Sequence, residues 1–437
     1  MVNDSHERWV AQEVSRCIQA WQACAGDPPA LDPRYSDRDH EAREIAYDAE
    51  LRAVEWEAKR LARSPRERAQ AEKRMIASFS RFAAHALDLE QEQIALLTED
   101  FLPAGIEFAR RARQFDPAIS REDTIQACRN AWTACGLQPL LGTCMSVTPS
   151  ILAYSLLYPY SDNYLDSADP SLAAKMTFSC RFRERLCGAD LPPLNQRERS
   201  IWALVELIES QFARTHFPQV FDCLLAIHHA QEESIRQLGA RGPAGDLLRL
   251  SFAKGGASVL ADACLARGWM SEEEMRVAFE WGALLQLGDD LQDVREDLGR
   301  SSLTLFTQAV ANEETLDNLV LQLLRFCEQV AARMNRMPHG SASLKTLLNL
   351  SWRSLILGAV ADAHHYFSPE FLARAEACSP FRFGFLRERS TRLADSRGLY
   401  SALFDFFVEP SPLQLTRATM QASRLALHPA RAFPSAD

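Results

Sequence analysis

An all-helical fold is the structure that this sequence predicts, and three observations lead to it. Apolar residues make up 47% of the 437 positions and charged residues 24%, the balance of an ordinary globular chain. Ala, Leu, Glu, Arg and Gln dominate, whereas alternating Val/Ile/Thr-rich runs and Asn-Gly turns are missing. Proline and glycine interrupt the chain where helices are expected to end.

Charge and hydropathy exclude several classes of protein. The 48 Lys+Arg against 58 Asp+Glu leave a net charge of −10, which argues against a nucleic-acid partner or a basic membrane-surface protein. No apolar run approaches the ~20 residues that a spanning helix needs, so we expect no stable membrane insertion. Residues 1–8 do not resemble a signal peptide. The 11 cysteines show no Cys-x-x-Cys spacing and are expected to be buried, reduced thiols of a cytoplasmic protein, rather than zinc ligands or disulfides.

Three regions follow one another along the chain. Residues 1–115, rich in Arg, Glu and Ala, are predicted to form N-terminal amphipathic helices without a chemical motif. Residues 116–400 are predicted to form the main helical domain, which holds every informative pattern. Residues 401–437 are predicted to be a helix end and a partly disordered tail.

The most informative pattern lies on a helix that begins with Ser271 and Glu274, which are spaced as a capping box. Residues 275–291 are apolar on nearly every side, which is typical of a buried helix. Asp289 and Asp293 nevertheless lie four residues apart, so they share one face at its end.

Clustered carboxylates on a buried helix repel one another and lose hydration, so a neutralising partner is expected. Asp290 lies beside the acidic face, and Asp297 projects between the two faces. Mg²⁺ is a natural partner because it prefers oxygen ligands and is commonly shared between carboxylates and substrate phosphates. The alternative is a solvated acidic helix end that pairs with Arg295.

A second acidic pair, Asp162 and Asp166, has the same spacing and follows the aromatic stretch 154–160. Pro159 should kink or restart the helix there. Alone, such a pair is usually a solvated helix face. Two pairs at the ends of apolar, aromatic helices indicate a shared metal site across a cavity.

An Asp-rich first motif followed by Asp-Asp-x-x-Asp in an all-helical chain resembles the class I isoprenoid (terpenoid) synthases. The resemblance is greatest to bacterial large-terpene synthases of the tetraprenyl-β-curcumene synthase type, and it spans about residues 120–370. The segments that carry it are 158–166, 227–234, 254–258 and 285–306. The first motif begins with a single Asp, unlike the Asp-Asp pair of head-to-tail elongases, and the Asn/Ser/Glu motif of small terpene cyclases is absent.

The resemblance implies a helical bundle around a deep apolar cavity and a Mg²⁺-dependent reaction of a long-chain polyprenyl diphosphate. Allylic ionisation would release diphosphate, and the carbocation would cyclise or eliminate a proton. The cofactor would be Mg²⁺, three ions in the family, bridging both motifs to the diphosphate. The implied metal ligands are Asp162, Asp166, Asp289, Asp290, Asp293 and Asp297.

Cationic and cavity residues complete the expected site. Lys254 lies on an apolar helix before Gly255-Gly256, which allow a neighbour to approach closely; with Arg295 and Arg300 it would hold the diphosphate. The expected cavity residues are Tyr154, Tyr158, His228, Gln231, Phe252 and Trp281. The structural alternatives are surface ion pairs for the arginines, a snorkelling lysine, and ordinary core packing for the aromatic residues and the histidine.

Other functions stay open at this level. A head-to-head condensing enzyme of the squalene/phytoene synthase type also uses a DxxxD first motif, and a polyprenyl diphosphate synthase shares the same chemistry. A non-catalytic helical scaffold is the alternative from another class. A homodimer is compatible with the resemblance, but nothing in the sequence decides the oligomeric state.

Overall fold

The computed structural model describes residues 3–26, 29, 31–60, 64–167, 171–237, 244–300, 302–395 and 397–408. These ranges contain helices and no strand, which confirms the all-α prediction. The predicted disordered tail lies almost wholly outside the described residues. The first helices are α1 (Asn3–Cys24), α2 (Asp37–Lys59), α3 (Pro65–Ala86), α4 (Gln91–Ala95), the π-helix η1 (Leu96–Phe101) and α5 (Leu102–Phe115).

The remaining helices follow in two groups. The first is α6 (Arg121–Leu140), α7 (Pro149–Leu157), the π-helix η2 (Tyr158–Asp162), α8 (Asn163–Asp166), α9 (Leu172–Leu186), α10 (Gln196–Gln211), α11 (Pro218–Gln237) and α12 (Ala244–Arg267). The second is α13 (Glu272–Gln292), α14 (Val294–Arg300), α15 (Leu305–Ala311), α16 (Asp317–Arg336), α17 (Ala342–Asp362), the 3-10 helix η3 (His364–Tyr366), α18 (Pro369–Glu376), α19 (Phe383–Asp395) and α20 (Arg397–Val408).

Helix α13 forms as its sequence predicts. The Ser271 side chain accepts from the backbone N–H of Glu274, and the Glu274 side chain accepts from the backbone N–H of Ser271, so the capping box is present. Phe279 and Trp281 are buried on different sides of the helix because α1, α12, α16 and α17 all pack around it. The helix is therefore a central element of the main core.

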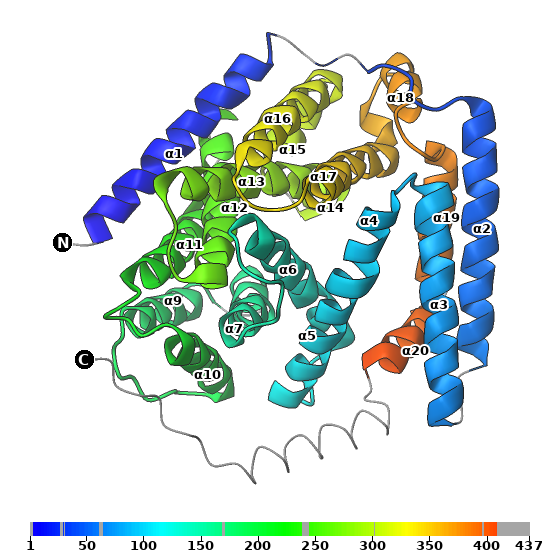
Figure 1. Cartoon of the computed structure of the whole chain (residues 1–437). Coiled ribbons are helices and arrows are strands. Elements are labelled where there is room, and N and C mark those ends of the chain that lie inside the picture. The colour runs from blue at the N-terminus through cyan, green and yellow to red at the C-terminus, as the bar shows by residue number, and fades with distance from the viewer. Residues whose placement is uncertain are drawn as a thin grey trace.

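Helices α12 and α13 approach each other so closely that their backbones are in contact (Figure 1). A Cβ atom added at Gly282 would lie 2.0 Å from the carbonyl oxygen of Gly255, and one added at Gly256 would lie 2.5 Å from the Phe279 ring. Only glycine fits these positions, as expected for Gly255-Gly256. The close packing fixes Lys254 beside the helix that carries the acidic motif.

The N-terminal helices divide between two parts of the structure. Helix α1 packs against α11, α12, α13 and α16, and its Cys17 and Trp21 belong to the main apolar core. Helices α2 and α3 pack against each other on the opposite side of the molecule (Figure 1). There Ala58 and Met75 form a small separate cluster with Phe406 of α20.

All 11 cysteines are free thiols. Seven are buried, as predicted, but Cys144, Cys180 and Cys187 are exposed, so the expectation of burial is wrong for these three. Cys187 follows the last residue of α9, where the chain leaves the bundle surface. Among the described helices, none has the length and apolar character needed to cross a bilayer.

Candidate functional site

A polar pocket of about 400 Å³ lies between α6, α12 and α13. Helix α13 contributes Asp289 from the second acidic motif, and Asp293 follows its last residue. Helix α12 contributes Lys254, and α6 contributes Arg129. Two carboxylates of the predicted metal motif and two cations therefore line the same pocket.

The two carboxylates of this pocket are costly to ionise without a cation. The Asp289 side chain is 46% exposed toward the pocket, and its carboxylate lies 3.5 Å from the Arg129 guanidinium. Burial and the neighbouring Asp293 nevertheless raise the pKa of Asp289 to about 6, while Arg129 and Lys254 oppose the shift. Burial and the charge of Glu296 also raise the pKa of Asp293. A bound cation would remove much of this penalty.

Asp290 is placed differently from its neighbour, because its side chain turns from the pocket toward α12. One of its oxygens accepts a hydrogen bond from Ser251 Oγ at 2.7 Å and the other accepts from Gln286 Nε2 at 2.9 Å. The residue is buried and does not line the polar pocket. Both oxygens thus already accept hydrogen bonds, and the one from Ser251 joins α12 to α13.

Three further predicted residues also lie outside the lining of the polar pocket. Asp297 is partly buried on α14, and its pKa is raised to about 6 by burial and by the charges of Asp290 and Asp293. Arg295 and Arg300 are exposed. Arg300 forms a 2.6 Å ion pair with Glu296 one helical turn away, which corresponds to the surface-pairing alternative.

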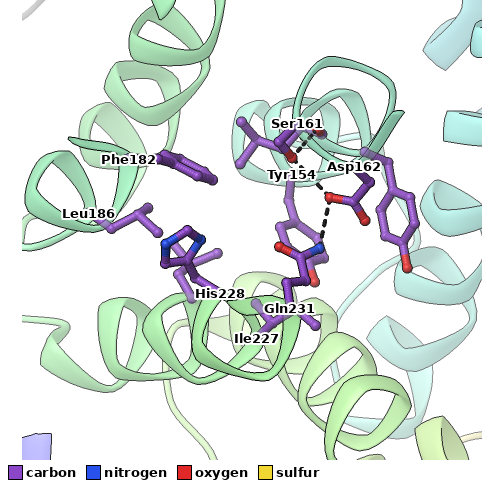
Figure 2. A pocket seen from close by; sticks show the side chains of 11 residues that line it. Tyr154, Ser161, Asp162, Phe182, Leu186, Ile227, His228 and Gln231 are labelled. Carbon is purple, nitrogen blue, oxygen red and sulfur yellow. Dashed lines mark hydrogen bonds between the residues drawn. The ribbon is translucent and has the colours of Figure 1, made fainter. Parts of the chain in front are cut away.

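The first acidic motif lies on an irregular helix. The chain passes from α7 into the π-helix η2 at Tyr158, and Pro159 stands at its start, where the expected kink occurs as a π turn. Asp162 ends this turn and is 6% exposed. Its Oδ1 accepts hydrogen bonds from Gln231 Nε2 at 2.7 Å and from Ser161 Oγ at 3.0 Å (Figure 2). The Asp166 side chain lies outside the described residues.

Asp162 lies at an inner pocket of about 30 Å³ that is mainly apolar. Tyr154, His228 and Gln231 also line it, with Phe182, Leu186 and other apolar side chains (Figure 2). This volume holds about two water-sized groups. These two pockets are a polar chamber and a small apolar one, and a third pocket of about 1220 Å³ lies beside Tyr160, Tyr164 and Arg197. The deep apolar cavity that the resemblance implied stays a prediction.

Tyr158 connects the two motifs because it lines both pockets. Its pKa is raised to about 12 by burial and by the charge of Asp162, with a smaller contribution from Asp289 and an opposing effect of Lys254. Asp162, Asp289 and Lys254 thus all lie close enough to Tyr158 to act on its hydroxyl. Asp162 of the first motif and Asp289 of the second therefore line two pockets that share Tyr158.

Two predicted cavity residues belong to the core instead. Phe252 is fully buried and stacks on Phe326 at 5.8 Å between ring centroids. Trp281 is 2% exposed and meets Trp352 edge-on at 5.0 Å. Neither residue lines the polar pocket or the inner pocket. Their positions agree with the core-packing alternative.

The pocket contains functional groups that sequence reasoning missed. Arg129 lies on a polar stripe of α6, together with Gln126, Asn130 and Thr133, opposite a face of buried alanines. Asp262 is 1% exposed, and its Oδ1 accepts a 3.0 Å hydrogen bond from Asn130. Helical spacing could have indicated Asp262, since it lies on the face of α12 that carries Lys254.

Within the described residues, no three His, Cys, Asp or Glu side chains converge as a ready-made metal site. A Mg²⁺ site completed by substrate phosphates needs only one or two carboxylates, which Asp289 and Asp293 supply. Comparison with protein-family models, curated proteins and solved structures gives no match for this chain. A functional assignment therefore depends on the chemistry of the two pockets.

Proposed function

We propose that this protein is a Mg²⁺-dependent class I terpene synthase that ionises an allylic polyprenyl diphosphate and cyclises or deprotonates the carbocation. The mixed charge of the polar pocket is the observation that supports this function. Asp289 and Asp293 suit a hard cation, while Lys254 and Arg129 suit phosphate oxygens. The inner pocket beyond Tyr158 is mainly apolar, but its volume of about 30 Å³ admits only a small part of a hydrocarbon chain.

Each group of residues has a distinct part in this reaction. Asp289, Asp293 and Asp162 would hold Mg²⁺, which when bound supplies charge stabilisation for a departing diphosphate. Lys254 and Arg129 donate to the phosphate oxygens as negative charge develops on them. The apolar inner lining keeps water from the allylic cation, and the π faces of Tyr154 and Tyr158 stabilise its positive charge.

The decisive test is Mg²⁺-dependent release of pyrophosphate from prenyl diphosphates of C15 to C35. We expect release by the wild type and a loss of at least 100-fold in a D289N/D293N double variant. D246N is the matched control, because Asp246 is an exposed carboxylate near the start of the same α12 that carries Lys254. If the wild type releases pyrophosphate from no substrate of this panel, the proposal is wrong.

Product mass separates this function from head-to-head condensation, because a condensing enzyme joins two chains and a synthase of the proposed kind does not. A non-catalytic scaffold makes a different prediction, since it should show no joint thermal stabilisation by Mg²⁺ and pyrophosphate.

A further inference from the structure

The pocket of about 1220 Å³, which we name the outer pocket, is lined mainly by residues of η2, α8 and α10. The chain passes from α7, which packs against α10 (Figure 1), into η2, which also contacts α10. Tyr158 lines the polar pocket, whereas the next two residues, Pro159 and Tyr160, line the outer pocket. The π-helix of the first acidic motif therefore contributes to the walls of both pockets.

A pair of amide side chains joins these two pockets. Gln126 lines the polar pocket, and Asn163 lines the outer pocket. Gln126 Nε2 donates to Asn163 Oδ1 at 3.4 Å, and Asn163 Nδ2 donates to Gln126 Oε1 at 3.3 Å. Because the two side chains are in contact, the outer pocket is a direct neighbour of the polar pocket.

Two arginines of α10 supply positive charge to the outer pocket. Ser200 and Ala203 share the face of α10 that lines this pocket. Helical spacing places Arg197 and Arg199, which also line it, on the two sides of that face. Both arginines are exposed, and within the described part of the chain neither forms an ion pair.

The carboxylates that could neutralise these arginines have other partners. Glu198 stands between them in the sequence, but it is 2% exposed and pairs with Arg181 at 2.9 Å. Asp116 lines the outer pocket, where one of its oxygens accepts a hydrogen bond from Tyr160 Oη and the other accepts from the backbone N–H of Ala118. The two guanidinium groups are therefore available to an anion.

The outer pocket also combines an ordered cation with apolar side chains. The Arg197 guanidinium lies 3.8 Å from the centroid of the Tyr164 ring, and such stacking leaves its N–H groups free to bind phosphate oxygens. Phe115 meets Tyr160 edge-on at 6.2 Å between ring centroids, and Pro117 lies in the same lining. A ligand that suits this lining carries a phosphate group on an apolar chain.

We propose that the outer pocket is a second binding site for polyprenyl diphosphate, in which Arg197 and Arg199 bind the diphosphate and the aromatic side chains contact the hydrocarbon. The identity of this ligand rests on the proposed function. The pocket exceeds the roughly 300–1,000 Å³ of most small-molecule sites, so it has room for a long hydrocarbon. Because the protein carries a net charge of −10, it repels an anionic substrate as a whole, and this local pair of cations captures the substrate beside the polar pocket without Mg²⁺.

The test is isothermal titration calorimetry in EDTA with geranylgeranyl thiolodiphosphate, a C20 analogue that does not ionise readily. We expect the wild type to bind this probe, and R197Q/R199Q to bind it about 10-fold more weakly or worse. R52Q/R66Q is the matched control, because it removes the same charge from exposed arginines of α2 and α3, and it should match the wild type. R129Q/K254Q changes the polar pocket instead and should stay within about 2-fold of the wild type.

Inorganic pyrophosphate tests the contribution of the hydrocarbon. It should bind the wild type in EDTA about 10-fold more weakly than the C20 probe, because it makes no apolar contact. Equal affinities for pyrophosphate and the C20 probe would overturn the proposed site. So would the absence of probe binding by the wild type, or undiminished binding by R197Q/R199Q.

The outcomes also distinguish this site from the proposed function. The proposed function depends on Mg²⁺-dependent release of pyrophosphate, whereas probe binding in EDTA requires neither the metal nor the reaction. Release of pyrophosphate without arginine-dependent binding of the probe would overturn the second site alone. Arginine-dependent binding without any release would support the site and overturn the synthase activity.

Discussion

Replacing Gly282 by alanine should force the two central helices apart and weaken the site that they form. The new Cβ would lie 2.0 Å from the Gly255 carbonyl oxygen, which belongs to the backbone of α12 and cannot rotate away. Relief requires a shift of α12 relative to α13. Because Lys254 precedes Gly255 and Asp289 lies in the last turn of α13, such a shift changes the distance between a cation and a carboxylate of the polar pocket.

The magnitude follows from two opposing effects. Overpacking a core by one methyl group costs about 1–3 kcal/mol, and contact with rigid backbone corresponds to the upper end of that range. Alanine also gains about 1 kcal/mol over glycine in helix propensity. The net destabilisation is about 2 kcal/mol. With an unfolding entropy of about 2.1 cal/mol/K per residue, this lowers the Tm of the 437-residue chain by about 2 °C.

Gly358 provides the matched control for this change. It lies inside α17, and a Cβ atom added there meets nothing within 4 Å. G358A should therefore gain the helix-propensity term alone and raise the Tm by about 1 °C. Differential scanning calorimetry of both variants, with and without Mg²⁺ and pyrophosphate, measures the difference of about 3 °C. Equal Tm values for G282A and G358A, or an undiminished ligand-induced shift in G282A, would refute the reasoning.

Three further predictions address individual side chains. R129Q should reduce the joint thermal stabilisation by Mg²⁺ and pyrophosphate, whereas R81Q, which breaks the ion pair between Arg81 of α3 and Glu50 of α2, should not. Equal shifts would exclude Arg129 from the site. Burial raises the pKa of Asp262 well above its usual 3.8. The protonated carboxyl group therefore contributes to the free energy of unfolding in full below about pH 4, and this contribution is lost as the pH rises. D262N should thus become progressively more stable than the wild type from about pH 4 to pH 8 in urea titrations, and parallel curves would contradict this. Maleimide should label the exposed thiols Cys144, Cys180 and Cys187 first, and the buried thiols only after denaturation, as measured by mass spectrometry. Early labelling of the buried thiols would contradict their burial.

Local patterns were enough to predict much of the helical framework. The capping box at Ser271 and the apolar character of α13 predicted a buried central helix, because both depend on side chains within one or two turns. The pair Gly255-Gly256 predicted a close approach for the same reason, since the lack of a Cβ is a property of the residue itself. The acidic ends of α13 and η2 were likewise visible in the spacing of their aspartates.

Helical periodicity could not decide which carboxylates face the pocket. Asp289 and Asp290 are neighbours in the chain, yet one lines the polar pocket while the other accepts hydrogen bonds from Ser251 and Gln286. The difference arises from where α12 packs against α13. The local sequence of α6 also does not indicate that Arg129 lines the polar pocket, because a single arginine on a polar stripe of a helix is usually solvated.

Short-range periodicity and capping were sufficient to predict that the chain is helical, where its two acidic motifs lie, and which helix is buried. The packing of the helices was needed to show that Tyr158 lines both pockets, that Arg129 joins Lys254, and that His228 rather than His229 lines the inner pocket. Periodicity defines which side chains share a face of one helix. Which faces meet at a cavity depends on contacts between helices that are far apart in the chain.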